Sequence, residues 1–313
     1  MPYMRCATSK YLNYIKFDPY AIAQTKADGL FSNIIITDSI LFETRNGKFI
    51  NQLDHLKSII NTTTYNNIVI HGELRVLEDD GSVMPRKKGN GILNKCIKGS
   101  CDSSILNKIF FTAWDIIPLD SFLKGYTDTP YNIRFINTKN FVKETNSSYI
   151  NLIPYRLCES TEEVIKFYRE TRAKGEEGII VKNLDGIWKD SAAGSKDCIK
   201  LKHAFNCELK VIGWNYGGKT SKFNNTVGSL VCESSCGKLK VNVSGLTIQE
   251  RELNWNELIK NNAIITVEAE SVITSKNKSY YSLYLPSFVE IRYDKNEADS
   301  LNKIIESASE SNL

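Results

Sequence analysis

Residues Gln24-Thr25-Lys26-Ala27-Asp28-Gly29 stand four residues before an apolar run, Ile34-Ile35-Ile36. The run is typical of a buried strand, and the Asp-Gly pair is typical of a turn that precedes it. A lysine beside such a turn is usually a surface side chain. Lys26 is informative because further motifs follow it in order: Glu43-Thr44-Arg45-Asn46-Gly47, His71-Gly72-Glu73-Leu74, Phe111-Thr112-Ala113-Trp114-Asp115, Glu177-Gly178-Ile179-Ile180-Val181-Lys182, Lys200-Leu201-Lys202, and Leu285-Pro286 through Arg292 to Lys295.

The composition is that of a globular protein with room for two domains. The chain has 313 residues, of which 42% are hydrophobic and 24% charged. Lys and Arg total 40 against 36 Asp and Glu, so the net charge is +4. This excess is compatible with a polyanionic partner but too small to establish one.

The pattern of elements changes along the chain. The first two-thirds mixes apolar strand-like runs, near residues 34–36, 68–70, 109–114 and 178–181, with a helix from Thr161 that is capped by Thr161 or Ser160. After Phe205, five short alternating segments favour a small barrel of the OB type, although a sandwich has the same periodicity. Helical spacing returns at residues 301–308. We therefore expect an α+β protein with domains at 1–205 and 206–313.

Targeting and redox signals are weak. No stretch approaches the roughly 20 apolar residues of a membrane-spanning helix, and the first residues lack the apolar region of a secretory signal. We expect a cytoplasmic protein that does not associate with membranes. The eight cysteines are sparse and irregularly spaced, which predicts reduced thiols. Cys232 and Cys236 lack a second ligand pair for zinc.

The ordered motifs resemble those of the covalent nucleotidyltransferases, the superfamily of ATP-dependent DNA ligases, RNA ligases and mRNA capping enzymes. The resemblance covers nearly the whole chain and is closest to the DNA ligases of T-even-type phages. It implies a nucleotidyltransferase (adenylation) domain with antiparallel sheets and flanking helices, followed by an OB-fold β-barrel and a helical tail. Those ligases usually carry an N-terminal DNA-binding domain, and only 25 residues precede Lys26 here.

The resemblance implies that Lys26 attacks the α-phosphate of ATP and carries AMP covalently. A free lysine, with a pKa of about 10.4, is protonated at neutral pH and is a poor nucleophile. Neighbouring cations disfavour the charged form, so Lys200, Lys202 and a bound metal would lower the pKa of Lys26. The same cations would neutralise charge on the phosphates. Considered without the resemblance, Lys200 and Lys202 are two exposed lysines on one strand face.

The resemblance also assigns the nucleotide and metal ligands. Glu177 and Glu73 are expected to hold Mg²⁺, for which Mn²⁺ can substitute, and Glu73 could instead contact the ribose. Trp114 would stack on adenine, and Arg45 would contact the ribose or the nick phosphate. The remaining expected nucleotide contacts are Gln24, as the reader of the adenine amine, and Thr25. Structural alternatives are salt-bridged strand ends for the two glutamates and core packing for Trp114.

The second domain and a basic stretch complete the expected site. The resemblance implies that Arg292 and Lys295 orient pyrophosphate when the second domain closes, with a hinge near residues 202–207. Arg86, Lys87, Lys88 and Asn90 lie in a basic segment with two glycines, which we interpret as a loop. Its resemblance to a DNA-contacting stretch of the phage enzymes implies that it binds the nick, and a solvated turn is the alternative. Many ligases have arginine at the position of Phe31 and also at that of Tyr284. The T-even-type enzymes likewise lack the second arginine.

The favoured interpretation is a monomeric ATP-dependent DNA ligase that seals nicked double-stranded DNA, in the host cytoplasm if the gene is phage-encoded. An RNA ligase or a capping-type nucleotidyltransferase shares the covalent lysine and stays an alternative. A second alternative is a non-catalytic OB-fold DNA-binding protein with a decayed catalytic domain. Lys26, Glu73, Glu177, Lys200 and Lys202 are all present, which argues against decay. His55, His71 and His203 are expected to be non-catalytic.

Overall fold

The computed structural model describes residues 2–191, 193–219, 223–274 and 279–310. The chain divides into two compact units, Met1–Lys202 and His203–Leu313. Each unit has its own apolar core. No helix in these ranges is long and apolar enough to span a membrane.

The first unit contains two five-stranded sheets. The first sheet has the order β1 (Cys6–Thr8), β12 (Ser195–Lys202), β10 (Gly178–Lys182), β2 (Ala21–Thr25) and β9 (Tyr155–Cys158). The second has the order β4 (Ile40–Thr44), β3 (Leu30–Ile36), β5 (Ile68–Val76), β6 (Ile109–Pro118) and β8 (Ile150–Leu152). Neighbouring strands are antiparallel except β1 with β12 and β6 with β8. The expected mixture of helices with antiparallel sheets is confirmed.

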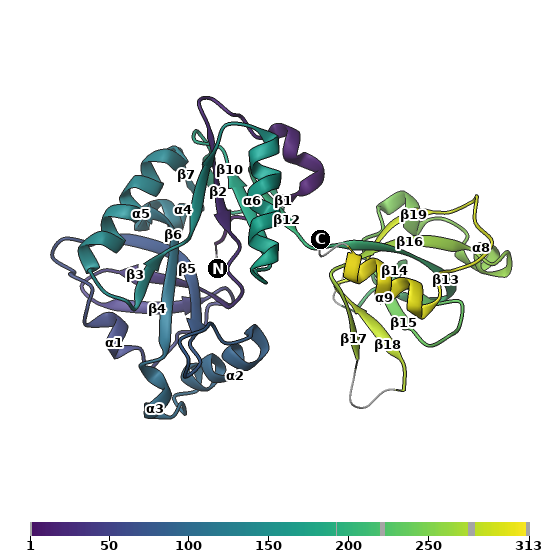
Figure 1. The fold of residues 1–313 in the computed structure, drawn as a ribbon, viewed down its shortest axis with the longest axis horizontal. Coiled ribbons are helices and arrows are strands. Elements are labelled where there is room, and N and C mark those ends of the chain that lie inside the picture. The colour runs from purple at the N-terminus through teal and green to yellow at the C-terminus, as the bar shows by residue number, and fades with distance from the viewer. Residues whose placement is uncertain (1, 192, 220–222, 275–278, 311–313) are drawn as a thin grey trace. The chain divides into compact units, whose positions relative to one another are not determined.

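Helices cover these sheets on defined faces. The helix α6 (Thr161–Ala173) packs Val164 and Phe167 against the first sheet (Figure 1). Its N-cap is Ser160, whose side chain accepts a hydrogen bond from the Glu163 amide. The remaining elements of this unit are η1 (Ser9–Tyr14), α1 (Asp54–Lys57), α2 (Arg86–Ile97), α3 (Ser103–Leu106), α4 (Leu119–Lys124), α5 (Tyr131–Thr145), and the pair β7 (Tyr126–Thr127) and β11 (Trp188–Lys189).

The second unit is built on one five-stranded sheet. Its strand order is β15 (Lys240–Val243), β14 (Val227–Glu233), β13 (Phe205–Tyr216), β16 (Ile264–Ala269) and β19 (Ser287–Ile291). A hairpin joins β17 (Ser271–Thr274) and β18 (Tyr281–Tyr284); β18 lies in the last of the five expected strand segments, and β17 was not expected. The helices are α7 (Ile248–Arg251), α8 (Trp255–Lys260) and α9 (Leu301–Glu310), the last at the expected place.

The outer strands of this sheet approach each other without forming a continuous ladder. Isolated bridges join Ser244, just after β15, to Ser287 of β19, and Leu239 to Tyr281. In the part of the second unit that the structure describes, no closed barrel is found. The expected OB barrel is therefore not confirmed at this level.

Candidate active site

The predicted nucleophile, Lys26, lies at the end of β2 on the face of the sheet opposite α6. Ala21 and Ala23 pack in the core that includes α6, and strand alternation places Gln24 and Lys26 on the other face. The Lys26 amide donates to the Gly178 carbonyl at 2.8 Å, which continues the β2–β10 ladder. Alternation turns the Thr25 side chain toward α6, so only its backbone lies beside the site.

The strand register brings the predicted lysines onto the same face. Ile180 lies opposite Gln24 on one side and opposite Lys200 on the other. Gly178 lies opposite Lys202, and a Cβ on Gly178 would meet the Leu201 carbonyl oxygen at 2.1 Å. Because only glycine permits this approach, the Glu-Gly pair of the motif fixes the spacing between the strands of Lys26 and Lys202.

Three carboxylates surround the Lys26 amine. Glu177 forms an ion pair with the Lys26 ammonium, and both side chains are partly exposed. Glu73 accepts a hydrogen bond from the Gly29 amide at 2.9 Å. Burial raises the pKa of Glu73 to about 7, although the charge of Lys26 lowers it. Burial and the charge of Glu177 also raise the pKa of Asp28.

This arrangement has the chemistry of a site for a divalent cation. Glu177 is paired with Lys26 and Asp28 with Arg86, whereas Glu73 is a carboxyl with a raised pKa that additional positive charge would ionise. No preformed cage of three or more such ligands occurs among the described residues. Mg²⁺ commonly uses one or two carboxylates together with substrate phosphates. Glu73 and Glu177 therefore fit the expected metal, provided that a nucleotide supplies the remaining ligands.

Gln24, the predicted adenine reader, is buried, and its amide nitrogen donates to the Tyr131 hydroxyl at 2.7 Å. That hydroxyl in turn donates to the Trp114 carbonyl at 2.8 Å. Lys182, also buried, places its ammonium 4.1 Å from the centre of the Tyr131 ring. Tyr131 thus joins Gln24 to Trp114, and the sequence had given no sign of its role.

Trp114 belongs to an aromatic group that also includes Phe31. The two ring centres are 5.9 Å apart, and the Tyr3 ring lies 6.2 Å from Phe31. The Arg45 guanidinium carbon lies 4.1 Å from the centre of the Tyr3 ring and 5.6 Å from that of Phe31. Arg45 therefore reaches the position at which many ligases carry the motif arginine.

The basic segment that we expected to be a loop is the start of the helix α2, so that structural prediction was wrong. Pro85 precedes the helix, and a stripe of apolar residues anchors it: Ile92, Leu93, Cys96 and Ile97. Lys88 contacts Glu78 at 2.8 Å, whereas the exposed Lys87 extends from the same turn.

Two residues of this segment belong to the surroundings of Lys26. Arg86 pairs with Asp28 at 3.2 Å, and the Asn90 amide donates to the Gly29 carbonyl at 3.3 Å. The start of α2 therefore supports the turn that follows the nucleophile. The predicted contact of Arg86, Lys87, Lys88 and Asn90 with DNA stays a prediction.

In the second unit, Arg292 and Lys295 face carboxylates of their own unit. Arg292 contacts Glu208 at 2.6 Å and Asp294 at 2.7 Å, and Lys295 lies 3.7 Å from Glu208. The predicted pyrophosphate-orienting cations are thus clustered and charge-paired within that unit.

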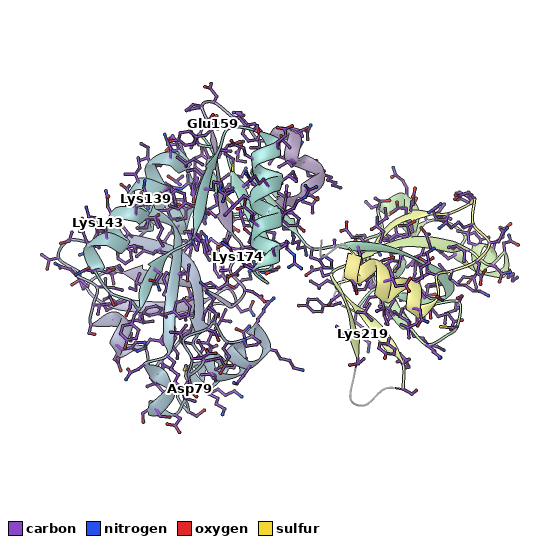
Figure 2. The ribbon with its side chains drawn as sticks, viewed as in Figure 1. Asp79, Lys139, Lys143, Glu159, Lys174 and Lys219 are labelled. Carbon is purple, nitrogen blue, oxygen red and sulfur yellow. The ribbon has the colours of Figure 1, made fainter. Side chains whose placement is uncertain are left out.

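The lysines of the site differ in surroundings from those at the periphery. Lys139 and Lys143, for example, project from α5 at the outer edge of the first unit (Figure 2).

His71 is buried and stacked on Trp188, with ring centres 5.4 Å apart, and burial lowers its pKa to about 4. The expectation that His71 is non-catalytic stays a prediction. The His55 ring forms a hydrogen bond with the Ile109 carbonyl at 3.0 Å.

Comparison with known proteins places this arrangement in a family. Residues 5–202 match the family model described as the ATP dependent DNA ligase domain. The DNA ligase of Enterobacteria phage T4 is 28% identical over 232 residues, which cover 70% of this chain and 46% of that protein. The chain thus spans about half the length of the relatives it matches.

Solved structures show the same fold. A structure described as Pmar-Lig_PreS3 gives a TM-score of 0.69 at 19% identity, covering 93% of this chain and 68% of that one. The ATP-dependent DNA ligase from bacteriophage T7 in complex with ATP gives 0.54 at 18% identity, covering 93% and 98%. Since the family match spans nearly all of the first unit, where the site lies, the chain belongs to the ATP dependent DNA ligase domain family.

Proposed function

We propose that this chain is an ATP-dependent DNA ligase that seals nicks in duplex DNA through a lysyl-AMP intermediate and a DNA-adenylate. The observation that carries the proposal is the surroundings of Lys26. Its amine contacts Glu177 on a sheet face that also bears Lys200 and Lys202. The residues proposed as nucleophile, metal ligands and phosphate-neutralising cations thus belong to one unit.

In the first step, the Lys26 nitrogen would form a bond to the α-phosphorus of ATP as the bond to the pyrophosphate oxygen breaks. Lys26 must lose a proton to attack, and Glu177 is the carboxylate in contact with its amine. Lys200 and Lys202 would offset the charge that moves toward the leaving group. Trp114 and the fixed Gln24–Tyr131 pair would hold the base.

A divalent cation bound by Glu73 and Glu177 would supply positive charge for the triphosphate. Its presence would favour the ionised form of Glu73, whose pKa is about 7 without it. We propose Mg²⁺, with Mn²⁺ as a substitute.

For the second unit, we propose an OB-type barrel that helps to hold DNA. The support is topological: the strand order β15-β14-β13-β16-β19, with the Ser244–Ser287 bridge between its two outer strands, is compatible with a small five-stranded Greek-key barrel. We further propose that Arg292 and Lys295 orient pyrophosphate, that the protein acts as a monomer, and that it acts in the cytoplasm.

The test is a gel assay on a nicked duplex with ATP and Mg²⁺, comparing the wild type with Lys26→Ala. We expect sealing by the wild type, and neither sealing nor protein labelling by the variant. Labelled GTP and single-stranded RNA, offered in parallel, separate the alternatives. Preferential labelling from GTP would indicate a capping-type enzyme, and joining of RNA but not of nicked DNA would indicate an RNA ligase. Either result, or labelling of Lys26→Ala, would contradict the proposal.

A further inference from the structure

Two cysteines lie next to each other beside the proposed adenylation site. Cys6 of β1 and Cys198 of β12 directly precede Ala7 and Ile199, which lie opposite each other in this parallel pair of strands. A side-chain hydrogen bond joins the two thiols. Cys198 is buried, and Cys6 is partly exposed. The two sulfurs are therefore close enough to react with each other, and one of them is accessible to a small molecule.

The thiols are on the same face of the first sheet as the site lysines. The residues that follow them in their strands pack in the core that includes α6, so alternation turns Cys6 and Cys198 toward the other face. Lys182 lies opposite Cys198 in the β10–β12 ladder, and Lys200 follows Cys198 by two residues. The pair of thiols therefore belongs to the strand that carries Lys200.

The groups around the pair favour one thiolate. The hydrogen bond with Cys198 lowers the pKa of Cys6, and neighbouring ammonium groups lower it further, although burial opposes the shift. These ammonium groups are those of Lys182, Lys200 and Lys26. In Cys198, the hydrogen bond with Cys6, burial and the charge of Asp115 raise the pKa. One cysteine is thus the more readily ionised nucleophile, and the other is its protonated neighbour.

We propose that Cys6 and Cys198 form a reversible disulfide when the protein is exposed to hydrogen peroxide, and that this disulfide slows the adenylation of Lys26. The Cys6 thiolate attacks one peroxide oxygen, the O–O bond breaks, and a sulfenic acid and hydroxide result. The hydroxide takes up the proton that the Cys6 thiol had released. The Cys198 sulfur then attacks the Cys6 sulfur, and the oxygen leaves as water with the Cys198 proton. Two thiols are oxidised, and one peroxide is reduced to two waters.

The disulfide acts on the site through β12. An S–S bond is shorter than a hydrogen bond between two thiols, so its formation has to draw β1 and β12 together at this point. The register of the two strands shifts between Cys6 and Ala7, so no regular ladder resists the movement there. Lys200, two residues further along β12, would be displaced from the triphosphate. This effect rests on the proposed function, whereas formation of the disulfide does not.

The test compares the reduced full-length protein with the same protein after treatment with hydrogen peroxide and removal of the excess. Free thiols are alkylated, and disulfides are mapped by mass spectrometry of the peptides. We expect a linked Cys6–Cys198 peptide, and self-adenylation from labelled ATP that is about tenfold slower than in the reduced protein. Dithiothreitol should break the link and restore the rate to within about twofold.

Two variants make the result specific. Cys6→Ser keeps a hydrogen-bonding group beside Cys198 but cannot form the disulfide. Its self-adenylation should be within about twofold of the wild type and should not respond to peroxide. Cys236→Ser is the control for general oxidation, because Cys236 is exposed and a hydrogen bond with Ser234 lowers its pKa to about 7. This variant should respond to peroxide as the wild type does.

A second pair of neighbouring thiols gives an internal control. Cys96 and Cys101 are hydrogen-bonded to each other and buried in the core of the first unit. Burial raises the pKa of Cys96 to about 12. We expect both to stay reduced in the same peptide map, because proximity without a favoured thiolate does not lead to oxidation.

Peptide maps without a Cys6–Cys198 link would overturn the proposal, and so would a peroxide response that persists in Cys6→Ser. A link that forms without any change in rate would overturn the effect on the site. Reduced wild-type protein that never becomes labelled would instead contradict the proposed function, and the peptide map would still decide whether the disulfide forms. The failures are therefore distinguishable.

Discussion

Each unit contains an arginine that forms an ion pair with a carboxylate, and the two ion pairs differ in how deeply they are buried. In the first unit, the side chains of Arg134 and Asp115 are 2% and 5% exposed, and they contact each other at 2.8 Å and 3.1 Å. Arg134 also donates to the Gly186 carbonyl at 3.0 Å. In the second unit, the side chain of Arg292 is 23% exposed, and its partner Asp294 is 67% exposed.

The difference indicates what each arginine can do. If Arg134 changed partners, it would leave a charge unpaired in an apolar interior, so its ion pair is fixed and structural. Arg292 can exchange Asp294 for a phosphate at modest cost, because Asp294 is exposed and water can solvate it when it is released. Glu208 is only 10% exposed, and it would keep its contacts with Lys295 and Thr266. This is the property that a pyrophosphate-orienting residue requires.

The largest effect should come from the buried pair. We expect Arg134→Met to lower the free energy of unfolding of the first unit by about 3–5 kcal/mol, because it leaves Asp115 charged and unpaired in the interior. Urea unfolding, with amide exchange in β6 and α5 as the local readout, measures this loss. The exposed Arg169→Met serves as the control. A loss below about 1 kcal/mol would mean that the pair is not structural.

Removing the charge of Glu208, the carboxylate that pairs with Arg292 in the second unit, should lower the free energy of unfolding by less. Glu208 also accepts a hydrogen bond from the Thr266 hydroxyl at 3.1 Å. We expect Glu208→Gln, which removes the charge but keeps the shape, to destabilise the second unit by about 1–2 kcal/mol. Thermal unfolding of this variant measures the loss. The control is Glu233→Gln, since Glu233 pairs with Lys240 at 3.5 Å. A loss as large as that of Arg134→Met would remove the distinction between the two sites.

The smallest effect is a pH dependence at Asp294. Hydrogen bonds from Arg292 lower the pKa of Asp294 from the ordinary 3.8 to about 2. A lowered folded-state pKa gives a contribution to stability that is present above pH 3.8 and is lost as the pH falls toward 2. A carboxyl-carbon NMR titration should give a midpoint near 2 that rises toward 3.8 in Arg292→Gln. Identical midpoints in the two proteins would mean that Arg292 does not hold Asp294.

The sequence predicted the parts of the molecule that depend on local pattern. The apolar runs became β3, β5, β6 and β10, and Ser160 caps α6 as one of the two expected caps. The basic segment at Arg86 was misread because its glycines suggested a loop. The packing of Leu93 and Cys96 in the first core favours a helix there instead.

The contacts that the sequence could not predict join residues far apart in the chain. Gln24 donates a hydrogen bond to Tyr131, which lies 107 positions away in the sequence. Arg5 and Arg45 both lie over the ring of Tyr3, and no sequence motif links them. Such pairs follow from sheet register and packing, which a single sequence does not encode in any local spacing. The last of the five expected strands, at residues 281–285, became β18, whereas β17 and β19 were not expected.

The most direct test of the central claim, that Lys26 is the adenylated nucleophile, is mass spectrometry of the protein after incubation with ATP and Mg²⁺. We predict a mass increase of one AMP, localised by peptide fragmentation to the Lys26 side chain. Addition of pyrophosphate should reverse it, because the lysyl-AMP bond retains the energy of the anhydride. An adduct on another residue, or no adduct under conditions in which nicks are sealed, would contradict the assignment.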